Sequence, residues 1–306
     1  MLDGKTIAVV VPAYNEAGFV GRVIDSFPAF VDRAYVVDDC SSDATWTEMC
    51  THAAAVNAAV EADPLPASIV GDGGVVFDPR IVTVRHEVNQ GRGAAVKNGY
   101  RRALADGIDV VAVMDADGQM DPDILHEIVG PVLRGEADYT VGNRLSGLDS
   151  WTGMPPFRLF GNVVLTLLTR AASGYWTLSD PQNGYTAISR EALDTIDVDA
   201  LYDGYGFLND VLMHLNVHSL RVRNVPMRAR YGDEESGIRY SSFIPKLSAL
   251  LLNGSWDRLK AKYCRRRAVT LAGAALVSRT QTTGPTTSDL ADSPLDAGDS
   301  PCDDVR

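Results

Sequence analysis

The stretch VAVMDADGQMDPD, residues 111–123, places four aspartates directly behind an apolar run. Asp115 and Asp117 stand one residue apart, and Gln119 brings another side-chain oxygen two residues later. Hard divalent cations such as Mg²⁺ and Mn²⁺ prefer oxygen ligands, and Mg²⁺ is often held by few protein carboxylates plus phosphate oxygens of a substrate. The spacing therefore predicts a metal site at Asp115, Asp117 and Gln119 that holds a diphosphate. The alternative is that the two carboxylates only mark a turn before the next helix.

Other polar groups also follow apolar runs that have the pattern of strands. In open α/β sheets ligands bind at the carboxyl ends of strands, because loops vary there while the sheet fixes their positions. We therefore expect the groups to make a single site. They are Pro12, Tyr14, Asn15 and Glu16; Asp38, Asp39, Ser41 and Asp43; Asp115, Asp117 and Gln119; and Gly142, Asn143 and Arg144.

The stretch NQGRGAAVKNGYRRAL, residues 89–104, is rich in glycine. Its glycines do not follow the GxGxxG spacing, and the chain contains no GxxxxGK[ST]. Both patterns let a backbone approach phosphate closely, so a dinucleotide-binding fold and a P-loop are disfavoured. We interpret the stretch as a tight turn at Gly91 beside a nucleotide, with Arg92 and Lys97 supplying positive charge.

Short apolar runs alternate with helical patterns and must position these residues. The patterns predict strands at 6–14, 34–39, 80–86, before 115, at 138–144 and at 221–231, and helices at 17–27, 43–60, 93–107, 157–173 and 204–218. Residues 182–193 have the pattern of a short strand that enters a helix. This alternation favours an α/β fold with a mostly parallel central sheet and helices on both faces.

The domain organisation follows from composition. Residues 1–239 are expected to form one catalytic domain, and the Pro-, Gly- and Asp-rich residues 61–79 a surface insertion in it. Residues 240–267 are expected to be an amphipathic helical segment. Residues 268–306, rich in Thr, Pro, Gly and Asp, are expected to be a disordered acidic tail.

Charge and cysteine content narrow the class of protein. The formal net charge is -12, with 40 acidic and 28 basic residues, and this balance argues against nucleic acid as a partner. The basic residues are mostly Arg, which together with abundant Asp resembles the composition of a halophilic archaeon. Four cysteines without a CxxC pair predict reduced thiols in the cytoplasm. Neither a signal peptide nor a spanning segment is predicted.

The end of the helical segment is strongly basic although the chain is acidic. Cations next to aromatic and aliphatic residues are typical of helices that lie on an anionic membrane surface. We expect a peripheral position on the inner face of the cell membrane; the alternatives are a solvated helix or a partner-binding face. The cations are Arg258, Lys260, Lys262, Arg265, Arg266 and Arg267. The apolar set Val163, Val164, Leu167 and Leu168 is interpreted most simply as core, and the alternative is that a prenyl chain runs there.

Seven motifs in order carry a resemblance to a known family. They are VVVPAYNE, VVDDCSSDAT, NQGRGAAVKNGYRRAL, MDADGQMDPD, VGNR, DPQNGYTAISREAL and VPMRARYGDEESG. Over roughly residues 5–240 the chain resembles the family-two glycosyltransferases, and most closely their dolichyl-phosphate mannose or glucose synthase branch. The resemblance implies a GT-A fold, a nucleotide-sugar donor such as a UDP- or GDP-hexose, Mg²⁺ or Mn²⁺, and inversion at the anomeric carbon.

The same resemblance implies roles for particular residues. Asp115, Asp117 and Gln119 match a metal-binding DxDxQ motif, and Arg230 an arginine that covers the diphosphate. Arg144 and Arg158 match arginines that face an acceptor phosphate, whereas Asn162 replaces a serine that is frequent in relatives. The nucleoside pocket would be lined by Pro12, Tyr14, Glu16 and Asp39.

We therefore predict transfer of a hexose from a nucleotide sugar to a polyprenyl (dolichyl) phosphate. A phosphate acceptor is already anionic, so the metal ion and arginines matter more than a base. If the acceptor is instead a hydroxyl of a lipid-linked glycan, a general base is needed. Asp180 is the candidate for that base, and a turn-forming role before Pro181 fits it equally well. A protein of another class, a catalytically silent module that binds nucleotide sugar or lipid, is the remaining alternative.

Overall fold

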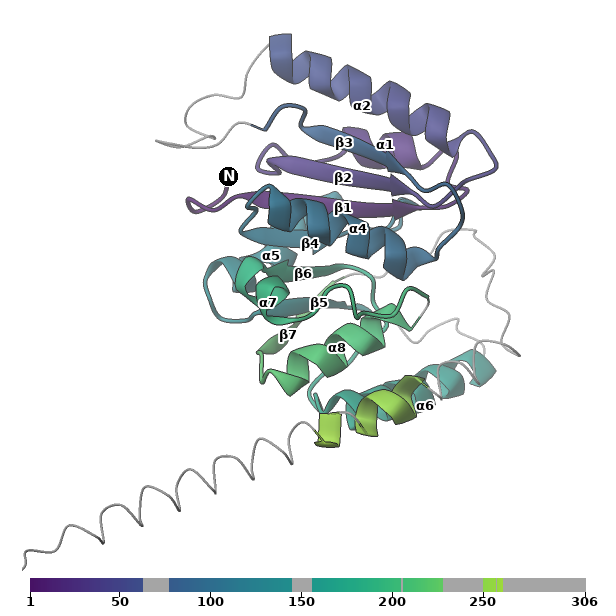
Figure 1. The fold of residues 1–306 in the computed structure, drawn as a ribbon, viewed down its shortest axis with the longest axis vertical. Coiled ribbons are helices and arrows are strands. Elements are labelled where there is room, and N and C mark those ends of the chain that lie inside the picture. The colour runs from purple at the N-terminus through teal and green to yellow at the C-terminus, as the bar shows by residue number, and fades with distance from the viewer. Residues whose placement is uncertain (63–76, 145–155, 205, 228–249, 257, 261–306) are drawn as a thin grey trace, which may run out of the picture. The chain divides into compact units, whose positions relative to one another are not determined.

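A seven-stranded sheet organises the chain (Figure 1). The computed structural model describes residues 1–62, 77–144, 156–204, 206–227, 250–256 and 258–260, with only the backbone for 156–163. The strand order is β3-β2-β1-β4-β6-β5-β7. The strands are β1 (Ile7–Ala13), β2 (Arg33–Asp38), β3 (Ile81–Arg85), β4 (Val110–Val113), β5 (Tyr139–Asn143), β6 (Thr186–Ser189) and β7 (Val222–Pro226).

The strand directions confirm a mostly parallel sheet. Strands β3, β2, β1 and β4 pair in parallel, as do β5 and β7. Strand β6 pairs antiparallel with both β4 and β5. Its amino end therefore lies at the same edge as the carboxyl ends of its neighbours, and the segment that leads into β6 reaches this edge as well. The sequence analysis did not predict this reversal.

Helices cover both faces of the sheet, as predicted. They are α1 (Val20–Asp25), α2 (Thr45–Ala62), α4 (Arg92–Ala105), α5 (Leu125–Leu133), α6 (Pro156–Ser173), α7 (Arg190–Thr195) and α8 (Phe207–Val217), with a short 3₁₀ turn η1 (Pro122–Ile124) before α5. Side chains alternate along a strand. In β1, Val9 and Val11 accordingly pack with α1, α2 and α5, while Val10 packs with α4, α7 and α8.

The predicted boundaries hold to within a few residues for most elements, with local differences. Helix α1 begins at Val20, three residues after the start that the pattern indicates, and β7 ends at Pro226. Residues 250–256 and 258–260 are helical, as expected of the C-terminal segment. Most of the insertion at 61–79, the rest of 240–267 and the tail at 268–306 lie outside the described residues.

A close contact between α4 and β1 depends on a glycine. A Cβ atom at Gly99 would lie 2.4 Å from Cγ1 of Val10 and 2.5 Å from its Cγ2. Val10 is fully buried, so it has little room to move. The glycine lets α4 approach the sheet closely, and α4 in turn carries Gly91 and Arg92 at its start.

Gly99→Ala tests this packing, because helix propensity and overpacking predict changes of opposite sign in the free energy of unfolding. Helix propensity alone predicts a gain of about 1 kcal/mol in the free energy of unfolding. We expect a loss of about 1–3 kcal/mol instead, because overpacking against Val10 dominates. Chemical denaturation of Gly99→Ala, of Val10→Ala and of the double variant measures the free energy of unfolding. The double variant should recover part of the loss that Gly99→Ala causes. A stabilised single variant would contradict the described packing.

Candidate active site

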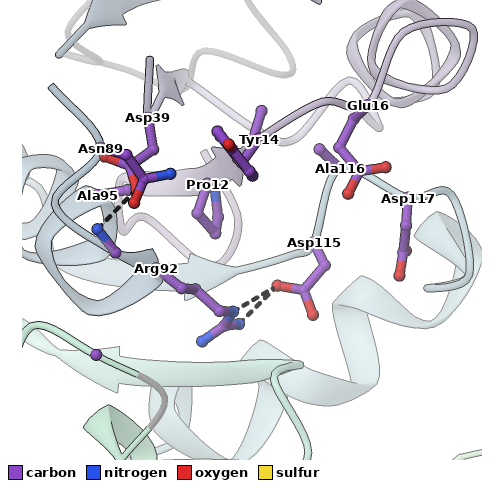
Figure 2. A pocket seen from close by; sticks show the side chains of 13 residues that line it. Pro12, Tyr14, Glu16, Asp39, Asn89, Arg92, Ala95, Asp115, Ala116 and Asp117 are labelled. Atoms are coloured by element: carbon purple, nitrogen blue, oxygen red, sulfur yellow. Dashed lines mark hydrogen bonds and ion pairs between the residues drawn. The ribbon is translucent and has the colours of Figure 1, made fainter. Parts of the chain in front are cut away.

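A pocket of about 460 Å³ opens at the carboxyl edge of the sheet (Figure 2). It brings together the ends of β1, β2 and β4 with the start of α4. Among the described lining residues, Gly204 alone comes from beyond residue 117. The lining residues are Pro12, Ala13, Tyr14, Glu16, Asp39, Asn89, Gly91, Arg92, Ala95, Asp115, Ala116, Asp117 and Gly204. Of the residues that the sequence analysis assigned to the donor and its metal ion, Gln119 and Lys97 are not among them, and Arg230 lies outside the described residues.

An ion pair joins two of the residues that line this pocket, Arg92 and Asp115. Nη2 of Arg92 lies 2.6 Å and Nε 3.0 Å from Oδ1 of Asp115 (Figure 2). Burial of the guanidinium works against its charge, but the carboxylate of Asp115 outweighs that effect and the pKa of Arg92 is raised above its ordinary value. A Cβ atom at Gly184 would lie 2.5 Å from Nη2 of Arg92 and 2.7 Å from Oδ2 of Asp115. The glycine therefore leaves the space that the ion pair occupies.

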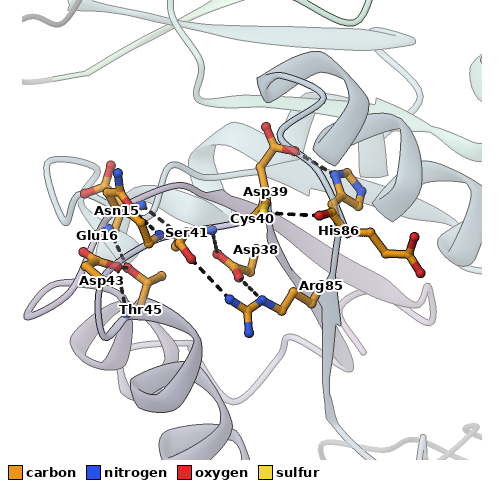
Figure 3. Close-up of polar contacts among 12 residues, drawn as sticks. Asn15, Glu16, Asp38, Asp39, Cys40, Ser41, Asp43, Thr45, Arg85 and His86 are labelled. Carbon is orange, nitrogen blue, oxygen red and sulfur yellow. Dashed lines mark hydrogen bonds and ion pairs between the residues drawn. The ribbon is translucent and has the colours of Figure 1, made fainter.

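The carboxylate of Asp39 has three polar contacts, with His86, Gln90 and Gly91. Its Oδ1 accepts from the backbone N–H of Gln90 at 2.8 Å, and its Oδ2 accepts from that of Gly91 at 2.7 Å. Oδ1 also lies 2.8 Å from Nδ1 of His86 (Figure 3). Asp39 is 3% exposed. The carboxylate thus fixes the turn before α4 as well as lining the pocket, and the sequence analysis missed His86, whose role shows only in the fold.

The loops after β1 and β2 are joined by hydrogen bonds (Figure 3). The backbone N–H of Asn15 donates to Oγ of Ser41 at 2.9 Å, and that of Glu16 donates to Oγ1 of Thr45 at 2.7 Å. Asn15 and Cys40 have φ of 58° and 64°, in the left-handed region. Such conformations persist where neighbouring contacts hold them. These contacts fix the backbone that presents Tyr14 and Glu16 to the pocket.

Asp117 takes part in a local turn and also lines the pocket. Its Oδ1 accepts from the backbone N–H of Gln119 at 2.9 Å, so a local turn exists as the simpler alternative requires. The same residue also lines the pocket beside Asp115. Within the described part of the chain, no three His, Cys, Asp or Glu residues group closely enough to hold a metal ion. A cation here would have few protein ligands, and the carboxylate oxygens of Asp115 and Asp117 would be among them.

Arg144 and Asp180 form a second ion pair at the same edge. Nε of Arg144 lies 2.7 Å from Oδ2 and its Nη2 3.1 Å from Oδ1 of Asp180, a bidentate arrangement. Asp180 is 6% exposed, and its backbone oxygen accepts from Asn183 in a turn. Neither residue lines the pocket. The pocket thus joins some members of the groups after β1, β2 and β4, namely Pro12, Tyr14, Glu16, Asp39, Asp115 and Asp117, whereas Arg144 is paired with Asp180 outside its lining.

Two further predicted residues lie in the segment after Arg144. Arg158 and Asn162 belong to α6, and their side chains lie outside the described residues. The apolar residues later in α6 differ from the prediction. Leu167 and Leu168 are each 50% exposed and Val164 is 36% exposed, so their interpretation as core is wrong. The helical period alone does not show which face of a helix is covered.

Lys97 does not offer its charge to the pocket. Its Nζ donates to the backbone oxygens of Asp199 and Leu201, at 2.9 and 2.7 Å, and to Oδ1 of Asp203 at 2.9 Å. The lysine is 5% exposed. It therefore fastens to α4 the loop that places Gly204 at the pocket. The prediction of a charge at the nucleotide was wrong here, because sequence spacing does not show this contact across about a hundred residues.

Gly91 and Gly93 fit the same loop. A Cβ atom at Gly91 would lie 2.7 Å from the backbone oxygen of Asp203, and one at Gly93 would lie 2.5 Å from that of Tyr202. Gly91 has a φ of 98°, which favours glycine. The absence of a side chain at these two glycines lets the backbone of Tyr202 and Asp203 pack closely against the start of α4.

Comparison with known proteins places the chain among sugar transferases. The UDP-N-acetylglucosamine–dolichyl-phosphate N-acetylglucosaminyltransferase of Methanococcus voltae is 26% identical over 228 residues, 74% of this chain and 86% of that protein. The polyprenol monophosphomannose synthase of Mycolicibacterium smegmatis is 28% identical over 267 residues, 85% and 90% of the two chains. The low-salt glycan biosynthesis hexosyltransferase Agl6 of Haloferax volcanii is 26% identical over 78% of this chain and 50% of that one.

Solved structures and a family model agree with these relatives. The glucosyl-3-phosphoglycerate synthase of Mycobacterium tuberculosis in complex with Mn²⁺, UDP and phosphoglyceric acid superimposes with a TM-score of 0.57 at 22% identity, over 83% of this chain and 78% of that one. This likeness confirms the expected GT-A fold. The model of the family described as glycosyl transferase family 2 matches residues 8–197. The chain belongs to glycosyl transferase family 2.

Proposed function

We propose that the protein moves a hexose from a nucleotide sugar to a polyprenyl (dolichyl) phosphate, with inversion at the anomeric carbon. The observation that carries this proposal is the joining of Asp115, Asp117 and Arg92 in one pocket at the carboxyl edge of the sheet. Relatives whose names specify transfer to dolichyl or polyprenol phosphate support it over most of the chain. Glycan assembly on such a lipid is the process that the product would serve.

A UDP-sugar is the donor that we propose. The related synthase of Mycobacterium tuberculosis has been solved with Mn²⁺ and UDP-glucose, and the Methanococcus voltae relative is named for a UDP-sugar. A GDP-hexose stays the second possibility. The nucleoside would lie beside Pro12, Tyr14 and Asp39, which line one side of the pocket. Charged residues line the other side, where a diphosphate would lie.

The donor set suits Mg²⁺ or Mn²⁺. Asp115 and Asp117 bring carboxylate oxygens to the pocket, and a hard cation with few protein ligands keeps positions for water and phosphate. Both hydrogen bonds from Arg92 go to Oδ1 of Asp115. We assign the cation to Asp115, Asp117 and Gln119. When bound there, it supplies positive charge that stabilises the departing diphosphate.

The chain's own residues account for the remaining requirements of the reaction. Arg92 lies at the pocket with its charge intact and stabilises negative charge on the leaving diphosphate. Arg144 binds the anionic acceptor, and Asp180 holds its guanidinium in place through two hydrogen bonds. We assign Asp180 this positioning role because both of its oxygens already accept from Arg144. Arg158 and Arg230 are proposed to add positive charge on the acceptor and diphosphate sides.

A membrane surface is the proposed location, on its cytoplasmic side. No helix in the described part of the chain is long and apolar enough to cross a bilayer. The C-terminal helix exposes Leu252, Trp256 and Leu259, at 72, 62 and 55%, and Nζ of Lys260 lies 5.3 Å from the centre of the Trp256 ring. This helix packs against α6 through Leu251 and Ala172. The relative from Haloferax volcanii supports a halophilic source.

Asp117→Ala tests the assignment of the pocket. We expect transfer to fall by about 100-fold or more, because charge on the leaving diphosphate is no longer stabilised. The measurement is radiolabel from UDP-glucose, UDP-N-acetylglucosamine or GDP-mannose in a chloroform-soluble, acid-labile product, with polyprenyl phosphate in vesicles and Mn²⁺. Asp123→Ala is the matched control, since Asp123 is exposed in the same acidic run and does not line the pocket.

The outcomes of this assay separate the alternatives. Equal activity of the Asp117 and Asp123 variants would overturn the assignment of the pocket. Product formed only on a lipid-linked glycan would favour a hydroxyl acceptor. Nucleotide binding without transfer by the parent protein, for every donor and acceptor, would favour a silent binding module.

Replacing Leu252 and Trp256 together by serine tests the membrane surface. Burial of a Trp or Leu side chain contributes roughly 2 kcal/mol, so we expect binding to anionic vesicles to weaken at least tenfold. Vesicle flotation measures the bound fraction. Val88→Ser is the control, because Val88 is 63% exposed and lies far from this helix in the sequence. Equal loss in both variants, or none in either, would show that the C-terminal helix does not dock.

A further inference from the structure

The segment from Asp180 to Gly184, which leads into β6, contacts several parts of the site at once. Asp180 binds Arg144 at the end of β5. Gly184 packs against Arg92 and Asp115 in the pocket. This segment reaches both because β6 runs antiparallel to β4 and β5, so that its amino end lies between their carboxyl ends. A displacement of the segment would therefore move both ion pairs.

Gln182, in the middle of this segment, forms hydrogen bonds with a buried polar group. Its Nε2 donates to Oδ1 of Asn209 in α8 at 2.7 Å and lies 3.3 Å from Oγ1 of Thr169 in α6. The hydroxyl of Thr169 donates to the same Oδ1 at 2.7 Å. Thr169 and Asn209 are both 0% exposed. One amide oxygen thus receives donors from α6 and from the segment.

This polar group is poorly suited to provide stability alone. Nδ2 of Asn209 is buried and has no hydrogen-bond partner among the described residues. Burial of an unpaired polar atom costs free energy, and apolar side chains could pack two helices without that cost. What the group does provide is direction, because hydrogen bonds fix donor and acceptor within narrow distances and angles. It fixes α6 and α8 relative to the segment.

The proposed function assigns Arg158 of helix α6, and with it this helix, to the acceptor side of the reaction. The helix exposes Leu167 and Leu168, the two residues before Thr169, and it packs against the C-terminal helix. Resting on the proposed function, we infer that Gln182 is a positioning residue for the acceptor: through Thr169 and Asn209 it aligns α6 with Arg144 and with the donor pocket. The lipid that α6 meets is thereby presented to the anomeric carbon at a fixed place.

Gln182→Met and Thr169→Val test the alignment, since each removes a donor to Asn209 and keeps a similar side-chain size. We expect KM for polyprenyl phosphate to rise about tenfold, the scale of a lost hydrogen bond, with binding of UDP and Mn²⁺ unchanged within about twofold. Thr169→Ser keeps the hydroxyl and should restore KM. An unchanged acceptor KM in both variants, or an equal weakening of UDP binding, would overturn the inference.

A matched control separates alignment from general loss of stability. Asn57→Leu removes two hydrogen bonds of similar length. In the parent protein Nδ2 of Asn57 donates to the backbone oxygen of Ile81 at 2.9 Å, and the backbone N–H of Ile81 donates to Oδ1 of Asn57 at 2.8 Å. Asn57 lies in α2, beside β3 at the far edge of the sheet. We expect the melting temperature of Asn57→Leu to fall as much as that of Gln182→Met, while the KM of Asn57→Leu for the acceptor stays at the parent value. A rise in acceptor KM in this variant would mean that lost stability explains the effect.

Hydrogen exchange gives a readout that needs no transfer activity. In Gln182→Met we expect faster exchange at the amide of Arg144, which lies 3.3 Å from Oδ2 of Asp180, and in the last turns of α6. In Asn57→Leu these amides should exchange as in the parent. If the parent protein transfers no sugar, the proposed function fails while this comparison still decides whether Gln182 aligns α6. Unchanged exchange at both places in Gln182→Met would refute the alignment.

Discussion

The site depends on how a crowded set of carboxylates is neutralised at one edge of a sheet. Asp39, Asp115 and Asp180 all lie at this edge, because parallel strands direct their carboxyl ends to it and the reversed β6 brings its amino end there. Like charges brought together out of water repel strongly. Each of these carboxylates has its own donors: backbone N–H groups and His86 for Asp39, Arg92 for Asp115 and Arg144 for Asp180. These donors offset the repulsion among the carboxylates, so that the three acidic side chains can lie at one edge of a folded sheet.

The start of α4 serves two of these carboxylates, so its position is decisive. Gly91 donates to Asp39 and Arg92 pairs with Asp115, one residue apart in sequence. Gly99 lets this helix approach β1, and Lys97 fastens it to the loop before Gly204. A helix that moved by an ångström would lose contacts at both ends of the pocket. The glycines of this stretch accordingly serve close packing.

The order and type of the elements follow from sequence because they depend on local patterns. Apolar runs of strand length and helical periods place β1 to β5 and α4 to within a few residues. The rule that polar residues at strand ends converge brought Tyr14, Asp39 and Asp117 to one pocket. What the sequence did not show are partners distant in the chain: Lys97 with Leu201, and Gln182 with Asn209. The sequence also did not show the reversed direction of β6, because the pattern of a short apolar strand does not depend on the direction in which the strand runs in the sheet.

Apolar residues are exposed in α6 and in the C-terminal helix, and the proposed membrane surface would cover them. A formal net charge of -12 would keep such a protein away from anionic lipids at low ionic strength. Salt changes this balance, because the screening length falls to about 3 Å at 1 M. Distant acidic residues are then screened, whereas cations in contact with the surface, such as Lys260 beside Trp256, keep part of their effect. Docking through a small apolar and basic face is therefore compatible with an acidic chain, and most so in high salt.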